Sequence, residues 1–441
     1  MHHLALIAGK LILVLLKILG RNGGSLPGKI AVKICPILLK YFKYPQKTIL
    51  VTGTNGKTST ANLIYQSFEK AGYKTVSNSR GDNIINGIAS LLIKNSSLDF
   101  KINADVLVLE VDELTLAKNL PYINASDIVI TNFFRDQLDR VGEMETIILK
   151  IQNSLLNYHG RLYLNEDDPN VNRFAHFVKN AEVITFGVEK VPHSKEKSEE
   201  AKEGRFCPVC GSELIHDYYQ YSHIGKYHCL SCNFSSDLPD FTAENINYTQ
   251  KSFDLVSKSK KICTLHYNLA ATYHIYNLTA ASCLCIKHNL DEKVLDDVFS
   301  HFYLGIGRME TIEVKNKKIL LNLVKNPAGA NEILKYIEDE KGKKSFIILL
   351  NDNFADGKDI SWIWDVNFEY MSKLDNVILT GTRAYEMAIR VKFARICDNI
   401  SVEKDIDKCI DTLLSFDSNL YVISTYTGLF DIRKKIIERG K

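Results

Sequence analysis

The 441-residue sequence has almost no net charge. Its 55 lysines and arginines nearly balance its 52 aspartates and glutamates, which leaves a formal charge of +3. Proteins that bind nucleic acid through their general charge carry a clear basic excess, so the composition gives no argument for that class. Repeats of solenoid length are also lacking. A chain of this length exceeds one ordinary hydrophobic core, so we expect two or three domains.

The sequence lacks an uncharged hydrophobic run long enough to cross a membrane. Its most apolar stretch, residues 1–20, is interrupted by Lys10 and Lys17, whereas a membrane span needs roughly 18 apolar residues. No small-residue cleavage site follows, which argues against a signal peptide. We predict an amphipathic helical segment over residues 1–45. Two interpretations stay open: its first helix packs on the body of the protein, or it lies on the inner membrane surface.

Cysteine is present in a pattern that argues against a disulfide-rich secreted protein. Four of the ten cysteines form two C-x-x-C pairs, "CPVC" and "CLSC", and the others stand singly in apolar stretches. This distribution is typical of a reducing compartment, and we predict a cytoplasmic protein. Pairs at this spacing can place four thiolates around one structural Zn²⁺. We therefore predict a zinc ribbon over residues 205–235, with the ligands Cys207, Cys210, Cys229 and Cys232. Free thiols and a nucleic-acid-binding ribbon are the alternatives, and the second lacks a basic stripe.

The rest of the chain alternates between short apolar runs and amphipathic stretches. Such alternation predicts an α/β fold with parallel strands and crossover helices. A first series of strands is predicted at residues 47–53, 105–112, 126–133, 161–168 and 181–187. A helix is expected at residues 273–290. A second series begins near residue 317, at "KILLNLV", "SFIILLN", "NVILTG" and "NLYVIST". We predict a separate C-terminal domain from these runs.

The stretch "VTGTNGKTST" at residues 51–60 connects a predicted strand to a predicted helix. Backbone N–H groups at a helix N-terminus bind phosphate, and a Gly-Lys-Thr sequence there is typical of a nucleotide-binding loop. Lys57 would reach the terminal phosphates and Thr58 would bind Mg²⁺. The common loop has a first glycine where Val51 stands, and here the glycine is Gly53. The alternative is a tight turn with an exposed lysine.

Carboxylates at two other strand ends are candidates for chemistry. Glu110 and Asp112 in "VLEVDE" stand at the end of a predicted strand, where Mg²⁺ ligands collect. Surface charges are the alternative, and it weighs more for Asp112 and Glu113 than for Glu110. The second group is "NDNFADGKDISWIWD", residues 351–365, which carries both tryptophans and four aspartates, of which Asp352, Asp356 and Asp359 crowd its first part. A loop after a buried strand is a common place for function. An acidic turn with aromatic anchors is the alternative.

Together these motifs resemble the Mur ligase family, which builds the peptidoglycan stem peptide. That family's ATP loop has two residues between its glycines, as in "TGTNGKT". Further similar stretches are "EVDE", "ITNFFRDQLDRVGE", "YNLTAA" and "GIGRMET". With the four-cysteine insert and "KNPAGANEIL", they resemble the ATP-using subunits of lipid II isoglutaminyl synthase, from about residue 25 to the C-terminus.

The resemblance implies an architecture and a reaction. A Mur-ligase-like central ATP-binding domain would span residues 46–306, with the ribbon inserted, and a Rossmann-like domain residues 307–441. ATP would phosphorylate the α-carboxylate of D-glutamate in the lipid II stem peptide. Ammonia from a partner glutaminase, GatD, would then displace phosphate and leave D-isoglutamine. The resemblance therefore implies a heterodimeric ligase of peptidoglycan synthesis that uses ATP, Mg²⁺ and structural Zn²⁺.

The resemblance also implies roles for individual residues. The triphosphate would be held by Gly53, Thr54, Asn55, Gly56, Lys57 and Thr58. Thr58 and Glu110 would bind Mg²⁺. Asn277 would face adenine and Arg308 the ribose or phosphates. Asp359 would complete the partner's Cys–His pair as a third triad member, and Trp362 and Trp364 would anchor the interface.

Two departures leave other readings open. The amino-acid-adding Mur ligases carry a metal-binding histidine where this sequence has Gln137, and Lys150 only roughly matches their modified lysine. An amino-acid-adding ligase of the Mur or folylpolyglutamate type is therefore an alternative, against which the zinc insert argues. A nucleotide-binding zinc module without catalysis is another.

Overall fold

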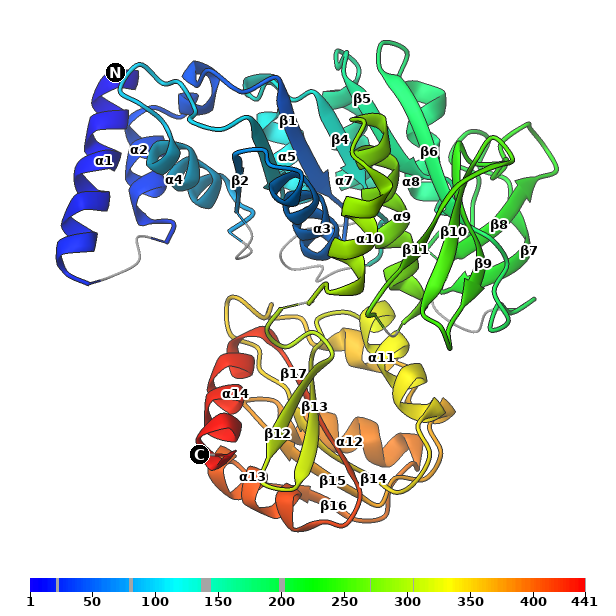
Figure 1. Ribbon diagram of the computed structural model, residues 1–441. Coiled ribbons are helices and arrows are strands. Elements are labelled where there is room, and N and C mark those ends of the chain that lie inside the picture. Colours follow the sequence, from blue (N-terminus) through cyan, green and yellow to red (C-terminus); the bar gives the residue numbers. More distant parts are fainter. Residues whose placement is uncertain are drawn as a thin grey trace. The chain divides into compact units, whose positions relative to one another are not determined.

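The computed structural model describes residues 1–20, 24–78, 82–135, 144–197, 203–269, 271–303 and 305–440. These residues form two compact units (Figure 1). Unit 1 holds the described residues within 1–134, 144–197 and 203–302, and unit 2 holds Arg135 with those from 303 to 440. Gln137, the residue predicted at the metal-histidine position, lies outside the described residues.

Unit 1 is built on a nine-stranded sheet with the strand order β11-β10-β9-β6-β5-β4-β1-β3-β2. The strands are β1 (Lys47–Thr52), β2 (Thr75–Ser77), β3 (Val106–Glu110), β4 (Asp127–Ile130), β5 (Arg161–Asn165), β6 (Glu182–Val188), β9 (Phe241–Asn247), β10 (Ser252–Ser257) and β11 (Lys260–His266). From β2 to β9, neighbouring strands are parallel. Strands β3 and β4 are buried along their whole length, which explains their continuous apolar sequences.

Helices cover both faces of this sheet (Figure 1). On one face lie α3 (Lys57–Lys70), α9 (Thr272–Lys287) and α10 (Glu292–Ser300), and on the other lie α5 (Glu113–Asn119), α7 (Met144–Leu155) and α8 (Pro169–Phe177). This two-sided cover is the doubly wound arrangement that the alternating sequence predicts, and all five strands of the first predicted series are confirmed. Helix α9 confirms the predicted helix near residue 273.

The sheet is mixed rather than purely parallel. Strands β10 and β11 extend it as antiparallel hairpins from β9, and the sequence analysis did not predict them. Exposed lysines begin β11, and only alternate residues along it are buried. An edge strand covered on one face needs few apolar residues, so its sequence carries a weak signal.

The N-terminal segment forms two helices, α1 (His2–Ile18) and α2 (Leu26–Ile34), followed by the short 3-10 turn η1 (Leu38–Tyr41). Helix α1 packs on α2 and on α4 (Ile85–Asn95), as the first of the two interpretations predicts. A side chain at Gly9 would come within 2.8 Å of Ile93, so glycine permits this close approach. None of the helices in the described residues is both long and apolar enough to cross a membrane.

Unit 2 contains a six-stranded sheet with the order β12-β13-β17-β14-β15-β16. The strands are β12 (Glu310–Val314), β13 (Lys317–Leu323), β14 (Lys344–Leu349), β15 (Asn376–Thr380), β16 (Ile400–Val402) and β17 (Asn419–Ser424). Its helices are α11 (Pro327–Asp339), α12 (Ala384–Ala394), α13 (Ile406–Ser415) and α14 (Tyr426–Gly440). All strands except β12 run parallel to their neighbours. A hydrophobic core lies on each face, which confirms the second α/β series.

A buried arginine supports the segment that carries both tryptophans. Arg390 of α12 donates hydrogen bonds to the carbonyl oxygens of Ile363 and Val366, at 3.1 and 2.6 Å, and to the Glu369 carboxylate. Trp362 in this segment is buried in the core of unit 2, whereas Trp364 is half exposed. The prediction of an interface anchor is therefore wrong for Trp362, because its ring packs inside its own unit.

We expect Arg390→Ala to destabilise unit 2 by about 2–4 kcal/mol, because two carbonyls and one carboxylate lose their donor together. Chemical denaturation followed by circular dichroism measures this change. Lys392→Ala, an exposed residue of the same helix, is the control and should change stability by less than about 0.5 kcal/mol. Equal effects of the two substitutions would contradict the role of Arg390.

Candidate nucleotide-binding site and acidic loop

Three neighbouring parallel strands of unit 1 end side by side. Strand β1 lies between β3 and β4, with Val51 beside Glu110 and Thr52 beside Ile130. After β1 the chain forms β2 and β3 on one side of β1 and then β4 on its other side. The direction in which strands are added to the sheet therefore reverses at β1. Ligands of doubly wound sheets bind beyond the carboxyl ends of the strands at such a reversal. The predicted nucleotide loop, residues 53–58, occupies this position.

Both glycines of the loop are required by their surroundings. Gly53 and Gly56 have φ angles of 122° and 85°, which favour glycine. A Cβ atom on Gly53 would lie 2.3 Å from Thr131 Oγ1, and one on Gly56 would lie 2.1 Å from Asn277 Oδ1. Helix α3 begins directly after Gly56, at Lys57. The two-residue spacing between the glycines thus lets the loop backbone pack closely against Thr131 and Asn277, and helix α3 begins directly after it.

The residues after β4 hold the loop in place. The backbone N–H groups of Thr54 and Asn55 donate to the carbonyl oxygen and the side-chain Oδ1 of Asn132, both at 2.8 Å. Thr131 Oγ1 donates to the carbonyl oxygen of Asn55 at 2.8 Å. Phe134 N–H donates to Thr54 Oγ1 at 3.0 Å. The sequence analysis included this stretch as a family motif but did not predict that it holds the nucleotide loop.

Lys57 is buried at the start of α3 rather than exposed. Its amine donates to the carbonyl oxygens of Gly53 and Thr54 and to Glu113 Oε1, the last at 2.9 Å. Burial by itself lowers the pKa of Lys57, but the charges of Glu113 and Glu110 outweigh it and leave the pKa raised. The lysine is therefore charged at neutral pH. The interpretation of Glu113 as a surface charge is wrong, since Glu113 is buried as the partner of Lys57.

Glu110 places a buried carboxylate beside the loop. Its Oε1 accepts a hydrogen bond from Asn83 at 2.8 Å, whereas its buried Oε2 accepts none from the described residues. A buried carboxylate oxygen without a partner is costly, and a cation would satisfy it. Asp112, the other acidic neighbour, caps the N-terminus of α5 through the N–H of Leu114.

Two further residues predicted to bind ATP lie in different units. Asn277 is buried on α9 of unit 1, with its side chain against Gly56 and with Nδ2 without a hydrogen-bond partner among the described residues. It thus lies at the loop itself, and its contact with adenine stays a prediction. Arg308 belongs to unit 2, just before β12, and its contact with the nucleotide also stays a prediction. Lys150 is exposed on α7.

In the acidic loop after β14, the first three aspartates have two different roles. Asp352 accepts from Arg383 Nε at 2.9 Å, and buried Asp356 accepts from the N–H of Thr427 at 2.7 Å. Both carboxylates thus join the loop to other elements of unit 2. Asp359 is only half buried and accepts a local hydrogen bond from Ser361 N–H at 2.8 Å. Hydrogen bonds from Ser361 lower the pKa of Asp359, so it is ionised at neutral pH.

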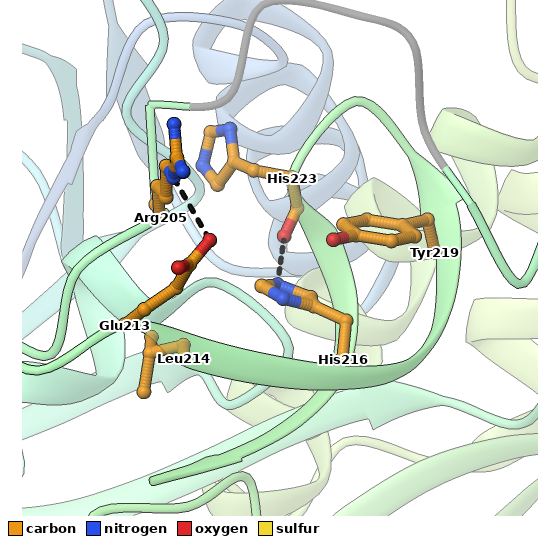
Figure 2. Close-up of a pocket in the computed structure, with 7 residues that line it drawn as sticks. Arg205, Glu213, Leu214, His216, Tyr219 and His223 are labelled. Atoms are coloured by element: carbon orange, nitrogen blue, oxygen red, sulfur yellow. Dashed lines mark hydrogen bonds and ion pairs between the residues drawn. The ribbon is translucent and has the colours of Figure 1, made fainter.

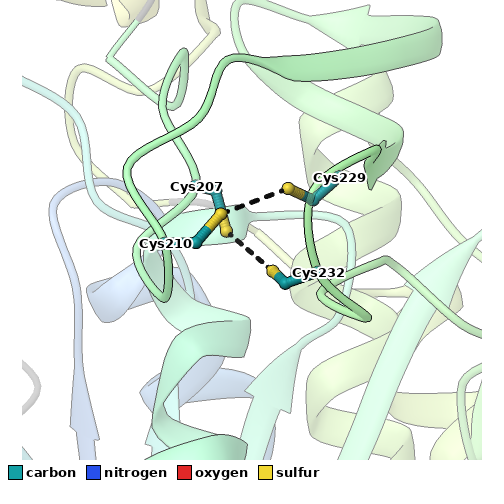
Figure 3. A group of neighbouring side chains, drawn as sticks. All are labelled: Cys207, Cys210, Cys229 and Cys232. Atoms are coloured by element: carbon teal, nitrogen blue, oxygen red, sulfur yellow. Dashed lines mark hydrogen bonds between the residues drawn. The ribbon is translucent and has the colours of Figure 1, made fainter.

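The four cysteines of the insert converge on one point, as Figure 3 shows. Their sulfur atoms all lie within 4.8 Å of one another, and the Cys207–Cys232 and Cys210–Cys229 pairs are each 3.5 Å apart. Four thiolates around one Zn²⁺ would lie roughly 3.8 Å apart, since each Zn–S bond is about 2.3 Å. Hydrogen bonds from Ser212 lower the pKa of Cys210 to about 6. The cluster could therefore bind a metal ion.

The insert consists of the hairpin β7 (Leu214–Tyr221) and β8 (Ile224–Cys229), and it is attached to the end of β5. The turn residue His223 is buried and lies 3.2 Å from Asp168, whose other oxygen accepts from the N–H of Phe133 at 2.8 Å. Phe133 directly follows Asn132, which holds the nucleotide loop. The insert is thus connected to the loop through two side chains that sequence reasoning missed, because neither stands in a recognisable motif.

A small pocket lies within the insert (Figure 2). Arg205 Nε donates to Glu213 at 2.9 Å on its wall, and the rings of His216 and Tyr219 stack 4.3 Å apart. The pocket contains none of the residues predicted to bind ATP. The candidate site is therefore not this pocket but the nucleotide loop at the ends of β1, β3 and β4.

Comparisons with known proteins agree with this geometry. The Mur ligase middle domain matches residues 51–230 and the MurT ligase C-terminal domain matches residues 323–429. The lipid II isoglutaminyl synthase (glutamine-hydrolyzing) subunit MurT of Staphylococcus aureus strain COL is 34% identical, over 93% of this chain and 92% of that protein. The chain belongs to the MurT family. The MurT subunit of Streptococcus pneumoniae R6 is 30% identical, over 99% of this chain and 97% of its own length.

A solved structure shows the same fold. A pseudomurein peptide ligase type C from Methanothermus fervidus superposes with a TM-score of 0.68 at 21% identity, over 92% of this chain and 80% of its own. The MurT-family chain thus has the Mur ligase fold, and its relatives are subunits, which implies a partner chain. The resemblance drawn from the sequence motifs and the α/β fold class are confirmed.

Proposed function

We propose that this chain is the ATP-using ligase subunit of a lipid II isoglutaminyl synthase. It converts the α-carboxylate of D-glutamate in the lipid II stem peptide into the amide of D-isoglutamine. The observation that carries this proposal is the near-full-length identity to two MurT subunits, of 34% and 30%. The Mur-type nucleotide loop and the acidic loop of unit 2 support it.

The residues of the nucleotide loop fit a triphosphate. The N-terminus of α3 presents backbone N–H groups and a helix dipole, and the positively charged Lys57 lies among them. When bound, ATP supplies the phosphoryl group, and Mg²⁺ neutralises part of its charge. Thr58 and the unpaired Oε2 of Glu110 would hold the metal ion. Lys57 would exchange its contact with Glu113 for the phosphates, so Glu113 keeps the amine oriented before the nucleotide arrives.

The chemistry requires activation of the carboxylate. A carboxylate oxygen of D-glutamate attacks the γ-phosphorus, ADP leaves, and an acyl phosphate forms. Ammonia then attacks the acyl carbon, phosphate leaves and the nitrogen loses a proton. Lys57 stabilises the charge that develops during the first transfer.

The ammonia comes from glutamine through a partner glutaminase, GatD, in a heterodimer. Asp359 fits the part of an acidic group that orients the partner's histidine, since it is ionised, half exposed and accepts a local hydrogen bond from Ser361. Trp364, which is half exposed, would contact the partner nearby. The lipid-linked substrate places the reaction in the cytoplasm, at the inner face of the membrane.

Reconstitution tests this function. Purified chain with ATP, Mg²⁺, lipid II and ammonium should give amidated lipid II without any partner, measured by mass spectrometry. Glutamine should support the reaction only when the glutaminase is added. Addition of an amino acid to the stem peptide instead of ammonia would favour the amino-acid-adding ligase and contradict the proposal.

We propose zinc as the metal of the cysteine cluster, because four thiolates without an open position suit a structural Zn²⁺. The apolar core of the insert consists of only a few residues, so the metal supplies much of its stability.

We expect Cys207→Ser to lower the zinc content from about one ion per chain to below about a tenth, since one of four ligands is lost. Elemental analysis by mass spectrometry measures the content, and limited proteolysis should then cleave within residues 203–236. Cys263→Ser, which alters a buried thiol outside the cluster, should keep its zinc. Full zinc content in Cys207→Ser would exclude this ligand set.

A further inference from the structure

Helix α1 carries an apolar face that the rest of unit 1 leaves uncovered. Its inner side, with Ala5, Leu6 and Gly9, is buried against α2 and α4. On its other side large apolar side chains are 45–75% exposed; they are Leu4, Ile7, Leu11, Val14, Leu15 and Ile18. A helix that is apolar on all sides is normally buried on all sides. Figure 1 shows α1 at the outer edge of unit 1, with α2 and α4 on one side only.

Lys10, one of the two lysines of α1, points to the body of the protein. The amine of Lys10 donates to the carbonyl oxygens of Ile93 and Ser96, at the C-terminal end of α4. A lysine at this position satisfies carbonyl groups that lack partners in the helix and complements the helix dipole. Because Lys10 is used in this contact, the outer face of α1 is left without charge until Lys17 near its end. An ordinary surface helix turns its charged side chains to solvent and its large apolar side chains to the core.

The surroundings of this face are basic. The first acidic residue of the sequence is Glu69, and eight lysines and one arginine precede it. Lys29 and Lys33 on α2 and Lys40 on η1 are exposed. An apolar helix face flanked by lysines is complementary to a bilayer with anionic headgroups. Asp99, whose neighbour Phe100 packs on His2 and His3, is paired with Lys43 at 3.1 Å. A protein partner or a second copy would not require this one-sided charge.

We propose that the outer face of α1 docks on the surface of an anionic membrane. The helix lies in the plane of the interface, with Leu11, Val14 and Ile18 among the acyl chains and the lysines at the headgroups. The inference rests on the N-terminal helices alone, and it holds or fails whether or not the chain amidates lipid II.

Flotation with vesicles that contain no lipid II and no ATP tests the proposal. The full chain should float with phosphatidylcholine vesicles that contain phosphatidylglycerol, and less with phosphatidylcholine alone. Leu11→Glu/Ile18→Glu should lower the vesicle-bound fraction at least about tenfold, because two carboxylates enter the apolar contact. Ile389→Glu, at an exposed position of helix α12, should bind as the wild type does. Lys29→Glu/Lys33→Glu should weaken binding to the anionic vesicles only.

A second variant adds a signal that appears on binding. Leu15→Trp should shift its fluorescence to shorter wavelength when anionic vesicles are added. Absence of the shift, or equal binding by Leu11→Glu/Ile18→Glu and the wild type, would overturn the proposal. The proposal would also be overturned if the wild-type chain is a dimer that does not bind vesicles and Leu11→Glu/Ile18→Glu is a monomer. A second copy of the chain, and not a membrane, would then cover the apolar face. Loss of vesicle binding in the complex with the glutaminase would overturn it as well.

Discussion

Lys57→Met should lower ATP-dependent amidation by at least about 100-fold with ammonium as the nitrogen source, since charge stabilisation of this kind is worth that much. The amine lies within its own loop, on the carbonyl oxygens of Gly53 and Thr54, and faces Glu113. The substitution also removes the ion pair between Lys57 and the buried carboxylate of Glu113. Product formation by mass spectrometry and binding of a fluorescent ATP analogue measure the two effects.

The control for this substitution is Lys70→Met, at the other end of the same helix. Lys70 pairs with Asp297 at the surface, and its loss should leave the rate within about twofold because exposed ion pairs contribute little. Thermal unfolding of both variants separates misfolding from loss of function. A folded Lys57→Met protein with full ammonium-driven activity would rule out the assigned ATP loop.

Asp359→Asn should separate the two nitrogen sources. Glutamine-driven amidation should fall by roughly 10³–10⁴-fold, the scale of losing the acidic member of a nucleophilic triad. Ammonium-driven amidation should stay within about twofold, because Asp359 lies in the acidic loop of unit 2 and accepts a hydrogen bond from the nearby Ser361 N–H. Both rates are measured with the glutaminase subunit present.

Asp398→Asn is the matched control, since this aspartate is exposed in the same unit and pairs with Lys373 at the surface. It should leave both reactions unchanged. If Asp359→Asn keeps both activities, the triad assignment is wrong. If it loses both, the carboxylate serves the ligase reaction or the fold instead.

The buried parallel strands could be predicted from the sequence, because a strand covered on both faces is a continuous apolar run. Strands β3 and β4 are such runs. Strands β10 and β11 were missed because polar residues interrupt their short apolar patterns, and along β11 only alternate residues are buried. A continuous apolar run identifies a strand that is buried on both faces, whereas a short strand with one face in water offers only a few alternating apolar residues.

The candidate site likewise has features that the sequence determined and features that only the tertiary structure decided. The sequence by itself determined the loop, its glycines and lysine, the four cysteines and the family, since these signals depend on spacing along the chain. Only the tertiary structure decided that Glu113 is the buried partner of Lys57, that Trp362 belongs to the core, and that Lys10 points inward on α4. Each of these depends on which distant segment meets the side chain. A charged or aromatic residue fits either solvent or a partner, and the packing of the other elements selects between them.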